Sequence, residues 1–167
     1  MEKMTEDNLQ AAFAGESQAH VKYLNFADKA GKEGFPNVAR LFQAASFAEQ
    51  MHATSHLRAL EGIQGTAANL GAALGGETFE IEQMYPAYKA VAEAQGEKRA
   101  LRSMDWALAA EKVHAKLYAE ARQSVEAGKD VAAQDIWVCT SCGFTMEGVP
   151  PDKCPVCGVS KEKFRKF

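Results

Sequence analysis

The chain of 167 residues is long enough for one ordinary domain, or for a helical bundle with a small appendage, and 47% of its residues are hydrophobic. Its formal net charge of -3 and its mixture of acidic and basic residues exclude the basic stripe that follows a nucleic-acid backbone. No apolar run approaches the length of a membrane span and no signal-like segment is recognised, so we expect a cytoplasmic protein without nucleic-acid or membrane partners.

Glycine and proline divide the first part of the chain into four segments rich in Ala, Glu and Lys, a composition typical of helices. The predicted helices span residues 5–30, 37–61, 77–95 and 97–127. The third is predicted to be a single helix, in which Pro86 kinks the axis or tightens a turn because it lacks a backbone N–H. The glycine-rich spacer before it, residues 62–76, is predicted to be a break.

The composition changes after Gly128. Residues 129–134 are predicted to be a linker, and residues 135–167 contain all four cysteines and three of the five prolines. We therefore expect a mainly α protein, with a four-helix bundle over residues 1–130 and a small four-cysteine β-ribbon domain over residues 135–167.

Each predicted helix carries a carboxylate on the apolar face that should enter the core of the bundle. The four residues are Glu16, Glu49, Glu77 and Glu111. An ionised carboxylate in a core is costly unless it is paired or binds a metal, and several together repel one another. One such residue alone would be an ordinary solvated charge, but the set of four indicates a cation site.

The carboxylates are arranged as an internal repeat with histidines. The two copies are Glu16 followed after 33 residues by Glu49-x-x-His52, and Glu77 followed after 34 residues by Glu111-x-x-His114. A spacing of three residues puts the carboxylate and the imidazole on one helix face, so both can reach one metal site. Four carboxylates and two imidazoles form the ligand set of di-iron and di-manganese bundles, and hard oxygen ligands favour iron or manganese.

Four further side chains lie near these faces. His20 and His56 have no counterpart in the other copy of the repeat, so we expect them to be partly exposed or to lie outside the ligand set. Tyr23 and Tyr85 are candidates for hydrogen bonds to ligating carboxylates, although a tyrosine at such a position is also a common core residue.

The cysteines form two knuckles, Cys139-x-x-Cys142 and Cys154-x-x-Cys157, separated by eleven residues. Such knuckles present four thiolates tetrahedrally to one metal. Spacing alone does not distinguish a structural zinc site from a one-iron redox site, since both prefer this geometry. A di-iron centre that turns over needs electrons delivered singly, and this context favours iron.

Several motifs together resemble the rubrerythrin family over essentially the whole chain. They are Gly15-Glu16, Glu49-x-x-His52, Gly76-Glu77-x-x-Glu80 with Met84-Tyr85-Pro86, Glu111-x-x-His114, and the tail WVCTSCG...CPVCG. The most specific is Glu80, a carboxylate beyond the ligand set of a simple ferritin-like site, and the next is the rubredoxin-like tail. The resemblance implies a ferritin-like bundle with two non-haem irons and a rubredoxin-like domain with one iron bound by four cysteines.

The resemblance also implies a peroxidase that reduces hydrogen peroxide to water. Electrons would come from NAD(P)H through rubredoxin or an NAD(P)H-dependent reductase, and then through the cysteine-bound iron. Glu80 would replace His52 on one iron after oxidation, since the added positive charge favours an anionic oxygen ligand. The remaining roles would be Glu49 and Glu111 bridging both irons, Glu16 and His52 binding one, and Glu77 and His114 binding the other.

Family members are typically dimers, and some exchange helices between subunits, so the resemblance implies a homodimer and leaves helix exchange open. Three other functions remain in competition. A ferroxidase uses the same bundle chemistry but has little use for an electron-donating tail. A zinc-ribbon scaffold without catalysis would leave the core carboxylates without a purpose, and a di-iron oxygenase would need an apolar substrate cavity that the sequence does not reveal.

Overall fold

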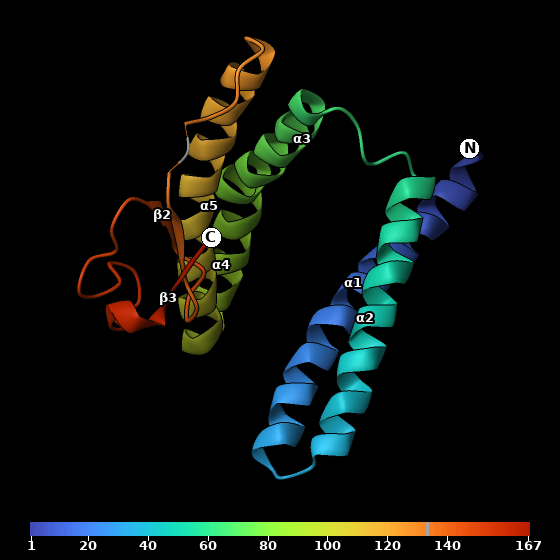
Figure 1. Cartoon of the computed structure of the whole chain (residues 1–167), viewed down its shortest axis with the longest axis vertical. Helices are drawn as coiled ribbons and strands as arrows, with labels where there is room; N and C mark the ends of the chain where they lie inside the picture. The colour runs from blue at the N-terminus through green and yellow to red at the C-terminus, as the bar shows by residue number, and fades with distance from the viewer. Residues whose placement is uncertain (133) are drawn as a thin grey trace. The chain divides into compact units, whose positions relative to one another are not determined.

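The computed structural model describes residues 1–132 and 134–167 and divides into two compact units, residues 1–64 and 65–167 (Figure 1). Both units are built around long helices that pack side by side, and the second also carries a small sheet. Residue 133, which belongs to the predicted linker, lies outside the described residues.

The first unit is a hairpin of two helices. Helix α1 spans Lys3–Lys32 and helix α2 spans Pro36–Ala59, close to the predicted ranges. Gly34 makes the tight turn between them with a φ of 85°, a conformation that costs glycine little. The fully buried Ser46 donates a hydrogen bond to the carbonyl oxygen of His20 at 2.9 Å, and the His20 ring contacts Ser46 at Nδ1. His20 therefore joins the two helices.

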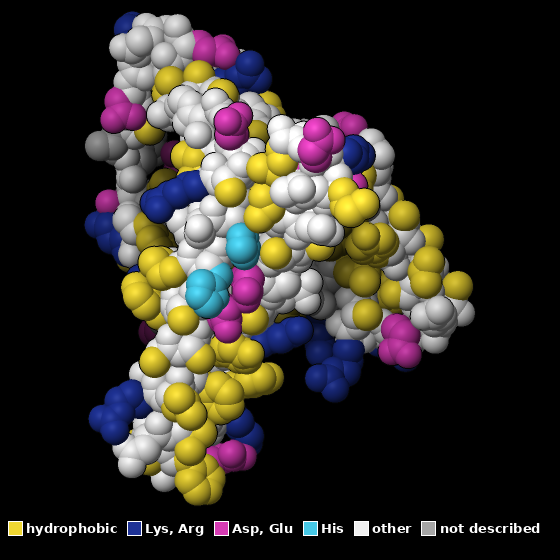
Figure 2. All heavy atoms as spheres, turned by 90° about the vertical axis from the view of Figure 1, so that its right-hand side faces the viewer, with side chains coloured by type: hydrophobic (Ala, Val, Ile, Leu, Met, Phe, Trp, Pro, Cys, Tyr) yellow, Lys and Arg dark blue, Asp and Glu magenta, His cyan; other side chains and the backbone are white. Residues whose placement is uncertain are grey.

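Large hydrophobic side chains remain exposed on this hairpin. Its buried residues within the helices are mostly alanines, whereas its exposed residues include Leu24, Phe26, Leu41, Phe47 and Met51. The face of the molecule seen in Figure 2 carries many hydrophobic side chains, and histidine and acidic side chains lie among them. Exposed apolar surface of this extent is typical of a face that another element covers.

The second unit begins with a continuous helical stretch. Helix α3 spans Thr66–Phe79, a π-helical turn (η1) spans Glu80–Met84, and helix α4 spans Tyr85–Ala94. The predicted start at residue 77 is wrong, because the glycine-rich segment is helical from Thr66. A Cβ atom added at Gly71 would lie 3.2 Å from Nη1 of Arg122, so the glycine leaves room for this arginine of the last helix, which packs along the segment. This packing offsets the helix cost of about 1 kcal/mol for a glycine.

The π turn ends two residues before Pro86, close to the place where a kink or tightened turn is predicted. Proline lacks an N–H, and its ring crowds the carbonyl group four residues earlier, here that of Glu82. The wider turn accommodates both effects, and the helical stretch continues through α4 to Ala94. Such π turns are frequent at functional sites, and this one begins at Glu80.

Helix α5, Lys98–Glu126, follows a turn at Gly96 and packs along α3 and α4. A three-stranded antiparallel sheet ends the chain, with strand order β2-β1-β3. Its strands are β1 (Ile136–Cys139), β2 (Thr145–Glu147) and β3 (Phe164–Lys166), with a 3-10 turn (η2, Lys161–Lys163) before β3. The mainly α fold with a small four-cysteine sheet is confirmed. Among the described residues, no helix combines the length and apolar character needed to cross a membrane.

Candidate metal centres

The first unit brings together Glu16 of α1 with Glu49 and His52 of α2. Each offers a ligand atom, and these atoms all lie within 4.8 Å of one another. The His52 Nδ1 atom lies 3.1 Å from Oε2 of Glu49 and 3.9 Å from Oε1 of Glu16. The His52 side chain is 57% exposed, so this cluster lies at the surface of its unit.

The second unit contains the matching cluster of Glu77 on α3 with Glu111 and His114 on α5. The His114 Nδ1 atom lies 2.7 Å from Oε2 of Glu111 and 3.8 Å from Oε1 of Glu77. The two clusters repeat the same geometry, with a histidine Nδ1 facing two carboxylates. Each cluster therefore forms half of the predicted six-residue ligand set.

The carboxylates of each cluster lie close enough to shift the pKa values of their neighbours. A hydrogen bond to Glu49, followed by burial, raises the pKa of Glu16, and the same bond lowers the pKa of Glu49. Burial, together with the nearby charge of Glu111, raises the pKa of Glu77 to about 7. Carboxylate oxygens and an imidazole nitrogen that converge within 4.8 Å are suited to a divalent cation of the hard or intermediate class. The donor set fits iron.

Glu80 and Tyr85 lie beside the second cluster without belonging to its closest group. Burial, followed by the charge of Glu111, raises the pKa of Glu80. Burial also raises the pKa of Tyr85, with further contributions from the charges of Glu80, Glu111 and Glu77. The Tyr85 hydroxyl therefore lies in the field of three carboxylates and stays protonated at neutral pH.

The two tyrosines chosen from the sequence differ in their surroundings. The Tyr23 ring packs with Phe26 and Phe42 at centroid distances of 6.2 and 6.1 Å, in an aromatic group between α1 and α2. Sequence reasoning missed Tyr118, whose ring lies 6.3 Å from that of His114. Burial and the charges of Glu77 and Glu111 raise the pKa of Tyr118. The sequence offered one sign of this role, because Tyr118 follows His114 by one helical turn and so shares its helix face.

The four cysteines converge at one end of the sheet, with Sγ atoms all within 4.8 Å of one another. Sγ of Cys139 lies 3.7 Å from that of Cys157, and Sγ of Cys142 lies 3.6 Å from that of Cys154. Burial raises the pKa of Cys139 and Cys142. At Cys157 burial acts in the same direction, but the backbone of Val159 and the neighbouring thiols outweigh it and lower the pKa to about 7. Four thiols at this spacing fit one tetrahedral metal ion.

Two family profiles match this chain. The rubrerythrin profile covers residues 7–122, and the profile for the rubredoxin-like domain of rubrerythrin covers residues 137–165. The chain belongs to the rubrerythrin family. Its cofactors are accordingly two non-haem irons in a di-iron centre and one iron in the rubredoxin-like domain, and its activity is that of an oxidoreductase.

Several relatives match this rubrerythrin family member over nearly their whole length. Rubrerythrin-2 of Clostridium acetobutylicum is 39% identical, over 98% of this chain and 97% of the relative. Rubrerythrin of Nitratidesulfovibrio vulgaris is 32% identical, over 96% and 92%. Among solved structures, nigerythrin in its fully reduced, all-ferrous state is 32% identical, with a TM-score of 0.56 over 98% of this chain and 86% of that chain.

The raised pKa of Glu77 predicts how the metal-free rubrerythrin chain responds to pH. Its carboxyl group titrates near 4.5 when unfolded and near 7 when folded, so the folded state binds more protons in this interval. The contribution of Glu77 to the free energy of unfolding is therefore greatest below pH 4.5 and is lost as the pH rises to 7. Urea unfolding of the metal-free wild type and of Glu77→Gln between pH 5 and 8 measures it.

We expect the Glu77→Gln variant to lose less stability than the wild type over that pH range. The control is Glu93→Gln, which changes an exposed carboxylate on α4 and should keep the wild-type slope. An identical slope in Glu77→Gln and wild type would contradict the prediction.

Proposed function

We propose that this protein is a rubrerythrin-type peroxidase that reduces hydrogen peroxide to two water molecules, consuming two electrons and two protons. The electrons would come from NAD(P)H through rubredoxin or an NAD(P)H-dependent reductase and enter at the cysteine-bound iron. The supporting observation is that one chain carries both carboxylate–histidine clusters and a four-thiolate cluster. A ferroxidase needs the first but not the second. The proposed setting is the cytoplasm, where thiols stay reduced.

We propose ligand roles for these clusters within two domains, residues 1–130 and 135–167. When bound, the irons supply Lewis acidity and electrons at the peroxide. In the proposed arrangement Glu49 and Glu111 would bridge the two irons, Glu16 and His52 would hold one, and Glu77 and His114 would hold the other. The third iron would be held by Cys139, Cys142, Cys154 and Cys157.

We propose that Glu80 replaces His52 as a ligand on oxidation. His52 is suited to leaving, because its contacts to carboxylates in the cluster run through Nδ1 alone. Glu80 is suited to entering, because it begins the π turn and its burial already disfavours an isolated charge. Binding to a more highly charged metal would relieve that cost.

Tyr85 and Tyr118 are the proposed donors of hydrogen bonds to the ligating carboxylates. Burial and the nearby carboxylates raise both pKa values, so each hydroxyl keeps its proton at neutral pH. A protonated phenol beside a metal-bound carboxylate orients that ligand and can pass a proton toward the substrate.

The proposed homodimer follows from the length of the connection between the two hairpins. A ferritin-like bundle joins its two hairpins by one long crossover, and here the only connection is residues 60–65 between α2 and α3. Those residues reach at most about 25 Å, whereas the 24 residues of α2 are about 36 Å long. We therefore propose that each hairpin completes its bundle, and its metal site, with the complementary hairpin of a second copy.

Helix exchange predicts complementation between two inactive variants, Glu49→Ala in the first hairpin and Glu111→Ala in the second. In an exchanged heterodimer of the two, both lesions fall in one site and the other site is intact, so about half of the wild-type activity should return. The two variant subunits carry different tags and are produced together, so that the heterodimer can be isolated by both tags.

The control heterodimer pairs wild type with Glu49→Ala and should keep about half of the activity in either arrangement. Without exchange, every site of the mixed dimer carries one lesion. An inactive mixed heterodimer beside an active control would therefore reject exchange.

The peroxidase proposal is tested by mixing the anaerobically reduced protein with equimolar peroxide or dioxygen while the thiolate–iron absorbance is monitored. We expect peroxide to restore the colour much faster than dioxygen, because electrons leave the cysteine iron for the peroxide. Equal rates would favour a ferroxidase. An absence of colour to bleach would favour a zinc-bearing scaffold.

A further inference from the structure

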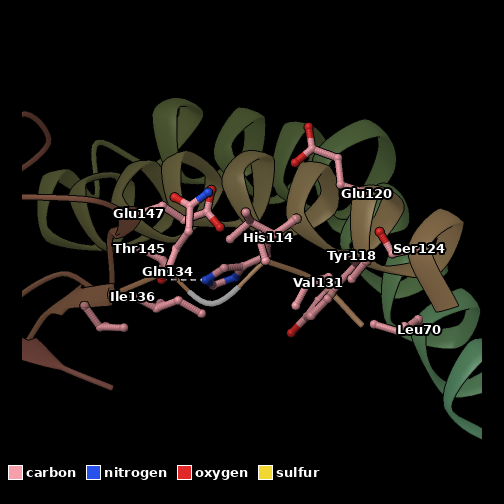
Figure 3. A pocket seen from close by; sticks show the side chains of 14 residues that line it. Leu70, His114, Tyr118, Glu120, Ser124, Val131, Gln134, Ile136, Thr145 and Glu147 are labelled. Atoms are coloured by element: carbon pink, nitrogen blue, oxygen red, sulfur yellow. Dashed lines mark hydrogen bonds between the residues drawn. The ribbon is translucent and has the colours of Figure 1, made fainter. Parts of the chain in front are cut away.

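His114 makes a second hydrogen bond, which leaves the helices and reaches the sheet. Its Nε2 atom lies 2.7 Å from Oγ1 of Thr145 on strand β2. Figure 3 shows this contact at the edge of a cavity of about 550 Å³ lined by α3, α5 and the first two strands. Thr145 is only 6% exposed, so its hydroxyl is shielded from water that would compete for the bond.

The direction of this bond follows from the other partner of Thr145. Its hydroxyl donates its single hydrogen to the carbonyl oxygen of Gly143 at 3.1 Å. With its hydrogen on Gly143, the Thr145 oxygen accepts from a His114 ring that carries a proton on Nε2. A neutral imidazole protonated at Nε2 has its lone pair on Nδ1, and Nδ1 is the atom that faces Glu111 and Glu77. In this arrangement a bond from Nε2 to Thr145 leaves the Nδ1 lone pair free for a metal.

We propose that Thr145 is a positioning residue for the di-iron site, holding His114 in the orientation and tautomer that direct Nδ1 at the metal. The inference rests on the proposed function of the cluster as an iron site. Ligating histidines commonly donate their other N–H to an acceptor that fixes the ring, and losing such a partner costs about 10–100-fold in metal affinity or activity. Here the acceptor belongs to the rubredoxin-like domain.

In the other copy of the repeat, the described residues give the histidine no comparable second hydrogen bond. Within the described residues, the structure gives His52 no hydrogen bond through Nε2, and its contacts all use Nδ1. His114 is held at both ring nitrogens and is 27% exposed, against 57% for His52. The tether therefore makes His114 the fixed histidine of the pair, which agrees with the proposal that His52 is the ligand that leaves.

The bond also joins the helical cluster to the cysteine site. Gly143, whose carbonyl accepts from Thr145, directly follows Cys142, and its amide donates to the carbonyl of Cys139 at 2.9 Å. The acceptor for His114 is thus held by the same turn that presents two of the four thiolates. Folding of that turn around its metal should strengthen the hold on His114.

The test compares Thr145→Val, which removes the acceptor at nearly constant volume, with Thr145→Ser, which keeps the hydroxyl. The matched control is Thr140→Val, an exposed threonine of the same domain whose hydroxyl donates to Lys163. Co²⁺ affinity of the helical site is measured by competition in the full chain with iron in the cysteine site. We expect Thr145→Val to bind about 10–100-fold more weakly, and Thr145→Ser and the control to stay near wild type.

Wild-type affinity in Thr145→Val, with the thiolate–iron spectrum intact, would overturn the proposal. If Thr145→Val loses the thiolate–iron spectrum, the proposal is tested instead by nitrogen-15 NMR of the Zn²⁺-loaded wild type. Metal bound at Nδ1 of His114, with a slowly exchanging proton on Nε2, is the expected result, and metal bound at Nε2 overturns the proposal. Neither readout requires peroxide turnover, so a wild type that fails to reduce peroxide would reject the proposed function without changing these results.

Discussion

Replacing Glu80 with Ala is expected to leave iron bound while slowing peroxide turnover at least tenfold, the scale on which ligand-supporting groups act. Glu80 lies outside the closest group of Glu77, Glu111 and His114, so that group can still hold metal. The charge of Glu111 nevertheless contributes to the raised pKa of Glu80, which shows that the carboxylate is near the site. Iron content and steady-state peroxide reduction measure the two effects.

The matched control is Glu82→Ala, in the same π turn and exposed to solvent. It removes an identical side chain two residues away, so its turnover shows any general effect of a substitution in the π turn. We expect wild-type turnover in Glu82→Ala. Unchanged turnover in Glu80→Ala would reject the ligand exchange, and loss of iron from Glu80→Ala would make Glu80 a constitutive ligand instead.

Replacing Cys154 with Ser is expected to abolish the thiolate–iron absorbance and to reduce NAD(P)H-linked peroxide reduction more than tenfold. The Cys154 side chain is 2% exposed and belongs to the core of the small domain with Cys139 and Phe164. A hydroxyl oxygen is a poor substitute for one of four thiolates. The di-iron site, reduced chemically, should still consume peroxide.

Ser141→Ala is the control for this variant, because Ser141 lies in the first knuckle with an exposed side chain. It should keep the absorbance and the linked activity. The bond from Thr145 to His114 adds one expectation, namely that Cys154→Ser also weakens Co²⁺ binding at the helical site, since the strand that holds His114 loses its metal support. Loss of both NAD(P)H-linked and chemically driven activity would mean that the two functions are not separable.

The ligand clusters were accessible to sequence reasoning because helix periodicity is local. Glu49 and His52 share a face through their spacing alone, as do Glu111 and His114, and the structure brings each pair together with one further carboxylate. Paired Cys-x-x-Cys knuckles likewise encode their own geometry, and the four sulfur atoms do converge. That all these residues act as iron ligands stays a prediction.

The start of the third helix was not accessible in the same way. Local propensity places a break in the glycine-rich segment, but Gly71 packs closely on Arg122 of α5 and the segment is helical. Contacts between distant segments outweigh a local cost of about 1 kcal/mol per glycine. The π turn at Glu80 could be anticipated only as some distortion near Pro86, because the sequence does not distinguish a kink from a widened turn.

By itself, the sequence determined the four helical faces that carry carboxylates, the two Glu-x-x-His pairs and the cysteine knuckles, since each depends on spacings of a few residues. Only the tertiary structure decided the partners of these groups. It pairs Glu16 with Glu49, raises the pKa of Glu77 through burial, and joins His114 to Thr145 across 31 residues of chain. Such effects depend on which surfaces pack together, and packing between segments distant along the chain leaves no periodic signal in the sequence.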